Sequence, residues 1–113
     1  MAYVNLGRPK EAIKELNEAL AADRRDFRSH LYLGMALIDA GKLDEAEKSL
    51  KEAYSRGGPN QARMAHLYLA SIYSTRKEYQ KAIDELETYL RENPKAPNSS
   101  KIQEAITKMK AKL

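Results

Sequence analysis

The four residues 30–33, His-Leu-Tyr-Leu, return unchanged as residues 66–69. Behind each copy the apolar and small residues keep the same spacing, so that Ala46 corresponds to Ala82, a shift of 36 residues (82 − 46). A repeat of this size can hold two short helices but cannot bury its own apolar face, so neighbouring repeats must complete the core. The chain is therefore predicted to fold as a series of stacked helical hairpins.

A partial copy precedes these two repeats. Ala12 and Leu16 lie 34 residues ahead of Ala46 and Leu50 (46 − 12 and 50 − 16). The underlying unit is thus 34 residues long, and the 36-residue step carries two extra residues. We assign them to the Gly-Gly-Pro-Asn stretch at residues 57–60, because a surface turn absorbs added length at little entropic cost.

Apolar residues at three-four spacing predict six amphipathic helices. They are expected at residues 9–22, 27–40, 43–56, 61–75, 78–92 and 99–113. Asp26 and Asn60 are predicted to be N-caps, and Gly41 is predicted to end the second helix in the left-handed conformation. Lys77 stands where the next repeat would place that glycine, so this turn either accepts a non-glycine residue or uses another geometry.

The last helix does not repeat the earlier unit. Ser100 and Gln103 have the spacing of a capping box. An apolar face follows, made of Ile102, Ala105, Ile106, Met109 and Leu113. Because the opposite face is polar, this helix is predicted to cap the stack against water.

The repeat pattern resembles the tetratricopeptide repeat, a helix-turn-helix unit. The residues that carry the resemblance are small or apolar at fixed positions of each unit. They are Tyr3, Gly7, Ala12, Leu16 and Ala19 in the first, Leu33, Gly34, Leu37, Gly41, Ala46, Leu50 and Ala53 in the second, and Leu69, Ala70, Tyr73, Ala82, Leu86 and Pro94 in the third. The resemblance implies an all-α, right-handed superhelical solenoid of antiparallel helix pairs with a C-terminal capping helix. We expect one domain over residues 1–113, divided into a partial repeat (1–25), two repeats (26–59 and 60–95) and the cap (99–113).

In this family the first helix of each pair lines a concave groove and the second forms the outer surface, and most members are scaffolds that bind peptides or proteins. The resemblance therefore implies a non-catalytic scaffold. On the first helix of each complete unit, the residues that turn away from the core stripe are the candidate binding residues. They are Arg28, Leu31, Tyr32, Met35, Asp39, Met64, Leu67, Tyr68, Ser71 and Thr75.

Two tyrosines one repeat apart, Tyr32 and Tyr68, would give this groove an apolar floor with hydroxyl groups that can form hydrogen bonds. The alternative is that both tyrosines only pack between repeats. Some family members hold the terminal carboxylate of a chaperone with a clamp of Lys, Asn and Arg. The corresponding positions here are Met1, Tyr32, Met64 and Tyr68, so binding of a chaperone C-terminal tail is disfavoured.

No pattern in the chain indicates catalysis. The sequence contains no nucleophile elbow, no phosphate-binding glycine loop and no cluster of metal ligands, so no cofactor is expected. His30 and His66 are predicted to be structural, because a metal site needs three or four converging ligands. The adjacent acids Asp84 and Glu85 point about 100° apart on a helix and are predicted to lie on a solvated face.

Composition limits the other classes of function. The chain has no run of about 18 apolar residues, so no membrane span is expected. It has no cysteine, which leaves cytoplasm and periplasm both open. Its formal net charge is +4 with the signs interspersed, except for a group of lysines in the last helix. These lysines, Lys101, Lys108, Lys110 and Lys112, could contact nucleic acid, but we expect a solvated surface.

Two expectations concern the context of the chain. The apolar side of the first helix, with Ile13, Leu16 and Leu20, has only a short segment before it to act as partner. We expect either a longer natural protein with further repeats or another domain, or self-association through this incomplete repeat. If the chain is part of a larger enzyme or secretion assembly, the alternative function is to position another domain without binding a ligand.

Overall fold

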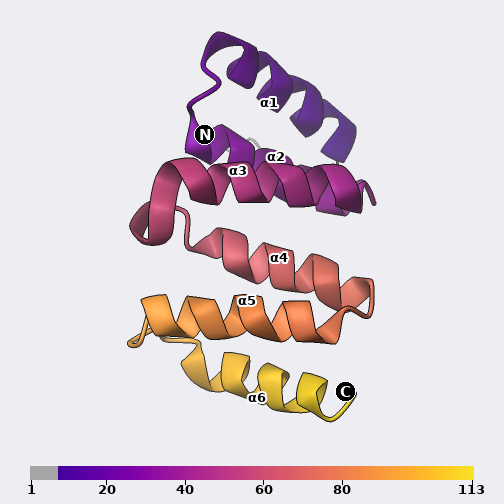
Figure 1. Ribbon diagram of the computed structural model, residues 1–113. Helices are drawn as coiled ribbons and strands as arrows, with labels where there is room; N and C mark the ends of the chain where they lie inside the picture. The colour runs from indigo at the N-terminus through magenta and orange to yellow at the C-terminus, as the bar shows by residue number, and fades with distance from the viewer. Residues whose placement is uncertain (1–7) are drawn as a thin grey trace. The chain divides into compact units, whose positions relative to one another are not determined.

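The computed structural model describes residues 8–113, which form six α-helices (Figure 1). The helices are α1 (Pro9–Ala22), α2 (Phe27–Asp39), α3 (Leu43–Gln61), α4 (Met64–Thr75), α5 (Tyr79–Glu92) and α6 (Ser99–Lys110). No strand occurs in this range, so the predicted all-α class is confirmed. The described residues form two compact units, which divide between Ala65 and His66. Across residues 8–113, every helix is too short or too polar to traverse a lipid bilayer.

In the first unit, α2 packs against both α1 and α3. Leu16 of α1 and Leu50 of α3 are fully buried. Gly34 of α2 lies directly over α3, since a Cβ atom built on it would be 2.6 Å from the Cγ of Leu50. A hydrogen atom in place of a side chain therefore lets the two helix backbones approach closely.

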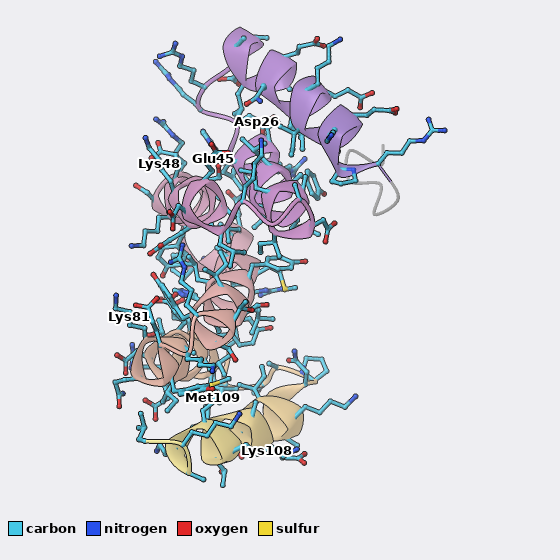
Figure 2. The ribbon with its side chains drawn as sticks, turned by 90° about the vertical axis from the view of Figure 1, so that its right-hand side faces the viewer. Asp26, Glu45, Lys48, Lys81, Lys108 and Met109 are labelled. Carbon is cyan, nitrogen blue, oxygen red and sulfur yellow. The ribbon has the colours of Figure 1, made fainter. Side chains whose placement is uncertain are left out.

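The turns of the first unit follow the predicted chemistry. Asp26 caps α2: its carboxylate accepts hydrogen bonds from the Arg28 backbone N–H at 3.1 Å and from the Ser29 hydroxyl at 2.8 Å. Figure 2 shows Asp26 where α2 begins. Gly41, at φ +77°, follows α2 in the left-handed conformation. The cap and the glycine fix where α2 begins and where the chain turns toward α3.

The end of α3 differs from the prediction. Helical residues continue to Gln61 across a break at Gly58, which has φ +71° and ψ −175°. Pro59 begins the additional turn, where its missing N–H leaves no hydrogen bond unmade. As a result α4 begins at Met64, and the predicted helix start at Gln61 with Asn60 as its N-cap is wrong.

This additional turn packs onto the start of α2. A Cβ atom on Gly57 would lie 2.8 Å from the Phe27 ring and 2.8 Å from the Cβ of Ala62. Ala62 is itself fully buried. The glycine at position 57 thus allows a close approach, which is why the two extra residues fold back onto the unit instead of forming an open loop.

In the second unit, the α4–α5 turn uses a non-glycine residue in the left-handed conformation. Lys77 has φ +62°, so the first of the two predicted alternatives is confirmed. The backbone hydrogen bond from Glu78 N to Tyr73 O, at 2.8 Å, matches the one from Lys42 N to Leu37 O in the α2–α3 turn, also at 2.8 Å. The two turns therefore share one geometry despite their different residues.

The start of α6 differs from the predicted capping box. The helix begins at Ser99 after Asn98, and no side chain caps it. Because Ser100 already lies inside the first turn, the Ser100–Gln103 box is wrong. Ile102 and Ile106 are buried, whereas Leu113 lies past the helix end and is 69% exposed, contrary to the prediction for its apolar face. Figure 2 shows Met109 on the side of α6 that faces α5.

Candidate protein-interaction surface

The five candidate binding residues in the first unit lie on one face of α2. At about 100° per residue, positions 28, 31, 32, 35 and 39 return to the same side of a helix. None of the five is buried: each is half-buried or exposed. The opposite sides of α2 hold the buried Leu33, Gly34 and Leu37. We call this surface the α2 strip, and its members are Arg28, Leu31, Tyr32, Met35 and Asp39.

The candidate residues of the next repeat have the same arrangement on α4. Met64 is 40% exposed, and the other four are half-buried or exposed. The Thr75 hydroxyl donates to the Ser71 carbonyl at 2.9 Å, within this face. We call this surface the α4 strip, and its members are Met64, Leu67, Tyr68, Ser71 and Thr75. The α2 strip belongs to the first compact unit, and all of the α4 strip except Met64 to the second.

The chemistry of the α2 strip is apolar in the middle and charged at the ends. Leu31, Tyr32 and Met35 give a half-buried apolar area, with Arg28 exposed before it and Asp39 exposed after it. The Arg28 guanidinium carbon lies 5.7 Å from the centroid of the Phe27 ring. Tyrosine and methionine beside single charges suit a surface that contacts a partner through apolar side chains and polar tips.

His66 lies in a polar arrangement that sequence reasoning missed. Its side chain is buried on α4, with Nδ1 2.9 Å from Glu85 Oε1 and Nε2 3.1 Å from Glu92 Oε1 of α5. Burial lowers the pKa of His66, but the hydrogen bonds and negative charges of Glu85 and Glu92 outweigh it, so the net pKa is raised above 6.5. Both ring nitrogens of an imidazolium can donate, one to each carboxylate.

Glu85 was predicted to be solvated, and this is wrong because it is half-buried against His66. The sequence did hold a signal. Glu85 and Glu92 are seven residues apart, which places both carboxylates on one face of a helix. The pairing of Glu85 and Glu92 with His66 could not be predicted from the pattern of one helix, because His66 lies on another helix. Asp84, by contrast, is exposed as predicted.

His30, the equivalent residue of the preceding repeat, has different contacts. Its Nε2 lies 3.0 Å from the backbone carbonyl oxygen of Arg24. At His66 the two carboxylates approach opposite ring nitrogens, so they do not converge on one point as metal ligands must. Within residues 8–113, no group of three or more histidines and acids could hold a metal ion.

Three of the four lysines in the C-terminal group have local partners. Lys108 Nζ lies 3.5 Å from Glu104, and Lys110 Nζ lies 3.7 Å from Glu87 of α5. The Nζ of Lys112 lies 5.1 Å from the centroid of the Tyr79 ring. These contacts are consistent with the predicted role of α6 as a polar-backed helix that packs on α5.

The apolar side of α1 is partly covered. Leu16 is fully buried, and the expectation that a further repeat, another domain or a second copy covers this side stays a prediction. Ile13 and Leu20 are half-buried. Met1, Tyr3 and Gly7, which entered the family resemblance or the clamp comparison, lie outside the described residues.

Comparisons with known proteins agree with this fold. Human Protein O-mannosyl-transferase TMTC1 is 30% identical over 95 residues, which make up 84% of this chain but 10% of that protein. The chain thus spans a tenth of the length of this relative. The second TPR domain of human RPAP3, solved in complex with an HSP70 peptide, has a TM-score of 0.77 at 22% identity, covering 92% of this chain and 82% of that one. MamA has a TM-score of 0.69 at 28% identity, covering 78% of this chain and 50% of its own.

The tetratricopeptide repeat profile matches residues 1–62 and again residues 36–97. The second match overlaps the first and ends just before α6, as expected for repeats followed by a separate capping helix. The chain therefore belongs to the tetratricopeptide repeat family of protein-interaction scaffolds.

Proposed function

We propose that this chain is a non-catalytic scaffold that binds a peptide or an extended protein segment along the α2 strip and the α4 strip. The observation that carries the proposal is the exposure of the strips. All ten residues remain at least partly accessible, although Leu33, Leu37 and Leu69 on the same two helices are buried. In the family arrangement, these strips are the surface that lines the concave groove.

The side chains of the strips favour a partner segment with apolar anchors. Tyr32 and Tyr68 stand one repeat apart and are both half-buried. Tyrosines in this position give a large contact area and lose little side-chain entropy on binding. The RPAP3 domain was solved with an HSP70 peptide, which supports a peptide as the class of ligand. Because Tyr32, Met64 and Tyr68 stand where a carboxylate clamp needs Lys, Asn or Arg, a chaperone tail is not the proposed partner.

Selection from a displayed library of random 12-residue peptides, followed by fluorescence anisotropy with the best binder, tests the proposal. Tyr32→Ala together with Tyr68→Ala should weaken binding at least about tenfold, since interface tyrosines commonly contribute more than about 1 kcal/mol each. The matched control is Tyr54→Ala together with Tyr79→Ala, which changes half-buried tyrosines outside the strips. Equal losses in both double variants, or loss only with a lowered melting temperature, would contradict the proposal.

The alternative is a segment that positions another domain and has no ligand of its own. The observation that favours it is the small share of TMTC1, named as a transferase, that this chain matches. If the alternative holds, the peptide selection enriches no sequence that depends on the tyrosines. A selected peptide that loses affinity in the strip variant excludes it.

A further inference from the structure

A groove runs between α1 and α3, on the side of α2 that faces away from the α2 strip. Two hollows, of about 320 Å³ and 400 Å³, lie along it and share Asn17 of α1. The α2 residues in these hollows are His30, Leu33 and Leu37. At about 100° per residue, these positions lie opposite Tyr32 and the rest of the α2 strip. The groove is therefore a second surface, contained in the first compact unit.

Both walls of the groove are continuous helix faces. The residues from α3 that line it fall at three-four spacing, and Figure 2 shows Glu45 and Lys48 on the side of α3 toward α1. The α3 wall consists of Glu45, Lys48, Ser49, Glu52 and Arg56. From Glu45 to Arg56 the wall extends about 16 Å at 1.5 Å per residue. This length matches roughly five residues of extended chain.

The floor of the groove, formed by α2 and the adjoining residues of α1, is mostly apolar, with Asn17 and His30 as its polar members. Ile13, Leu33 and Leu37 line one hollow, and Leu20 and Ala21 line the other. Side chains of an extended segment alternate in direction, so every second residue of an occupant would meet this floor. The floor thus favours a segment with apolar residues at alternate positions.

One end of the groove has a net positive charge, from Arg24 and Arg56 against Glu52. Arg24 and Arg56 both line the larger hollow. The Arg24 guanidinium forms no hydrogen bond or ion pair within the part of the chain that the structure describes. Arg56 contacts Glu52 through Nε at 2.6 Å, which uses one of its five donors. His30 Nε2 lies 3.0 Å from the Arg24 carbonyl oxygen and so fixes the backbone beside this end.

We propose that the α1–α3 groove binds an extended segment of another protein, with apolar side chains at alternate positions and an acidic side chain at the end that meets Arg24 and Arg56. The apolar floor provides contact area, and the two guanidinium groups select the carboxylate. This surface is independent of the one proposed above for the tyrosines, so the two proposals can fail separately.

The test uses the whole chain and a five-residue peptide, LSLSE, whose leucines and glutamate share one face of the extended chain; it is acetylated and amidated so that its glutamate is the only charge. Titration is followed by ¹H–¹⁵N NMR. We expect saturable shifts of the backbone signals of Asn17, Lys48 and Arg56. Arg24→Gln together with Arg56→Gln should weaken binding about tenfold, because charge-assisted hydrogen bonds are lost. The control is Arg25→Gln together with Lys51→Gln, two exposed cations that line neither hollow.

A second variant and a second peptide test whether binding depends on the groove and on the acidic side chain. Asn17 is exposed and shared by both hollows, so Asn17→Tyr should block the groove without disturbing the core. The peptide LSLSK should bind at least about tenfold more weakly than LSLSE, because a lysine would meet the two arginines. Equal binding of both peptides, or shifts confined to Tyr32 and Met35, would overturn the proposal. The proposal would also be overturned if the NMR signals of the groove residues shifted with protein concentration alone, because this would indicate a second copy of the chain as the occupant.

Discussion

His66 illustrates how a single residue can depend on a partner helix. The imidazole is buried, and its two nitrogens lie against two carboxylates of α5, Glu85 and Glu92. Removing an imidazolium from water disfavours its charge, but two adjacent negative charges favour it more, so the pKa of His66 is raised. The α4–α5 hairpin is therefore stabilised more strongly when His66 carries its proton.

This geometry predicts a pH dependence of stability. The folded-state pKa of His66 lies above 6.5, and the unfolded chain has the ordinary value near 6.5. The contribution of His66 to the free energy of unfolding is thus fully present below about pH 6.5 and is lost as the pH rises through the folded-state pKa. Urea unfolding at a series of pH values should show this decline, and His66→Gln should remove it.

The control for that prediction is Asp84→Asn, which changes an exposed acid next to Glu85 without touching His66. It should keep the decline, whereas Glu92→Gln should make it smaller. A pH profile of the His66→Gln variant that is parallel to that of the original chain would show that the two carboxylates do not act through His66.

At the scale of the element, the two hairpin turns form a natural pair. Gly41 and Lys77 stand 36 residues apart (77 − 41), and both have positive φ, +77° and +62°. The left-handed conformation brings the Cβ atom of a non-glycine residue close to the backbone carbonyl, at a cost of roughly 1–2 kcal/mol. The α4–α5 turn therefore holds strain that the α2–α3 turn avoids.

Substitutions at these two positions should relieve the strain in the α4–α5 turn and introduce it into the α2–α3 turn. Lys77→Gly should raise the free energy of unfolding by roughly 0.5–1 kcal/mol, because relief of the strain exceeds the added entropy of glycine in the unfolded chain. Gly41→Ala should lower it by about 1 kcal/mol. A Cβ atom on Gly41 would meet nothing within 4 Å. The loss of stability in Gly41→Ala would therefore come from the backbone conformation and not from a steric clash. Urea denaturation measures both, and a Lys77→Gly variant of lower stability would contradict the argument.

The same turns show how far the sequence determines the elements. The start of α2 at Asp26 and the turn at Gly41 were predictable, because a cap and a left-handed glycine act through local chemistry. The continuation of α3 to Gln61 was not. It depends on the packing of Gly57 against Phe27 and Ala62, and contacts across 30 residues (57 − 27) have no local signature.

The candidate surfaces divide in the same way. Helical periodicity alone predicted that Tyr32 and Met35 lie away from the core, because the buried stripe of α2 fixes which face remains. The groove between α1 and α3 brings together Asn17 and Lys48, and neither position is unusual in its own helix. Such a surface is visible only when the distance between two packed helices is known.

For the whole molecule, the distribution of charge matters more than its sum. The formal net charge is +4, and a basic protein can bind nucleic acid by releasing counterions from phosphates. Such binding needs several cations on one surface. In the second unit, however, Lys108 and Lys110 lie beside Glu104 and Glu87, which lowers the local positive potential.

We therefore expect no useful affinity for nucleic acid. A fluorescein-labelled 20-base-pair DNA, titrated with the chain to about 100 µM at roughly 150 mM salt, should not reach saturation in anisotropy, since weak non-specific complexes dissociate near this concentration. Glu104→Gln together with Glu87→Gln frees both lysines and should strengthen binding at low salt, which makes it the positive control. Saturation by the original chain, with a steep loss of affinity as salt increases and a further loss on Lys101→Gln and Lys108→Gln, would show that α6 binds phosphate after all. The scaffold would then have a nucleic-acid partner that binds α6, whose residues belong to neither of the two proposed peptide-binding surfaces.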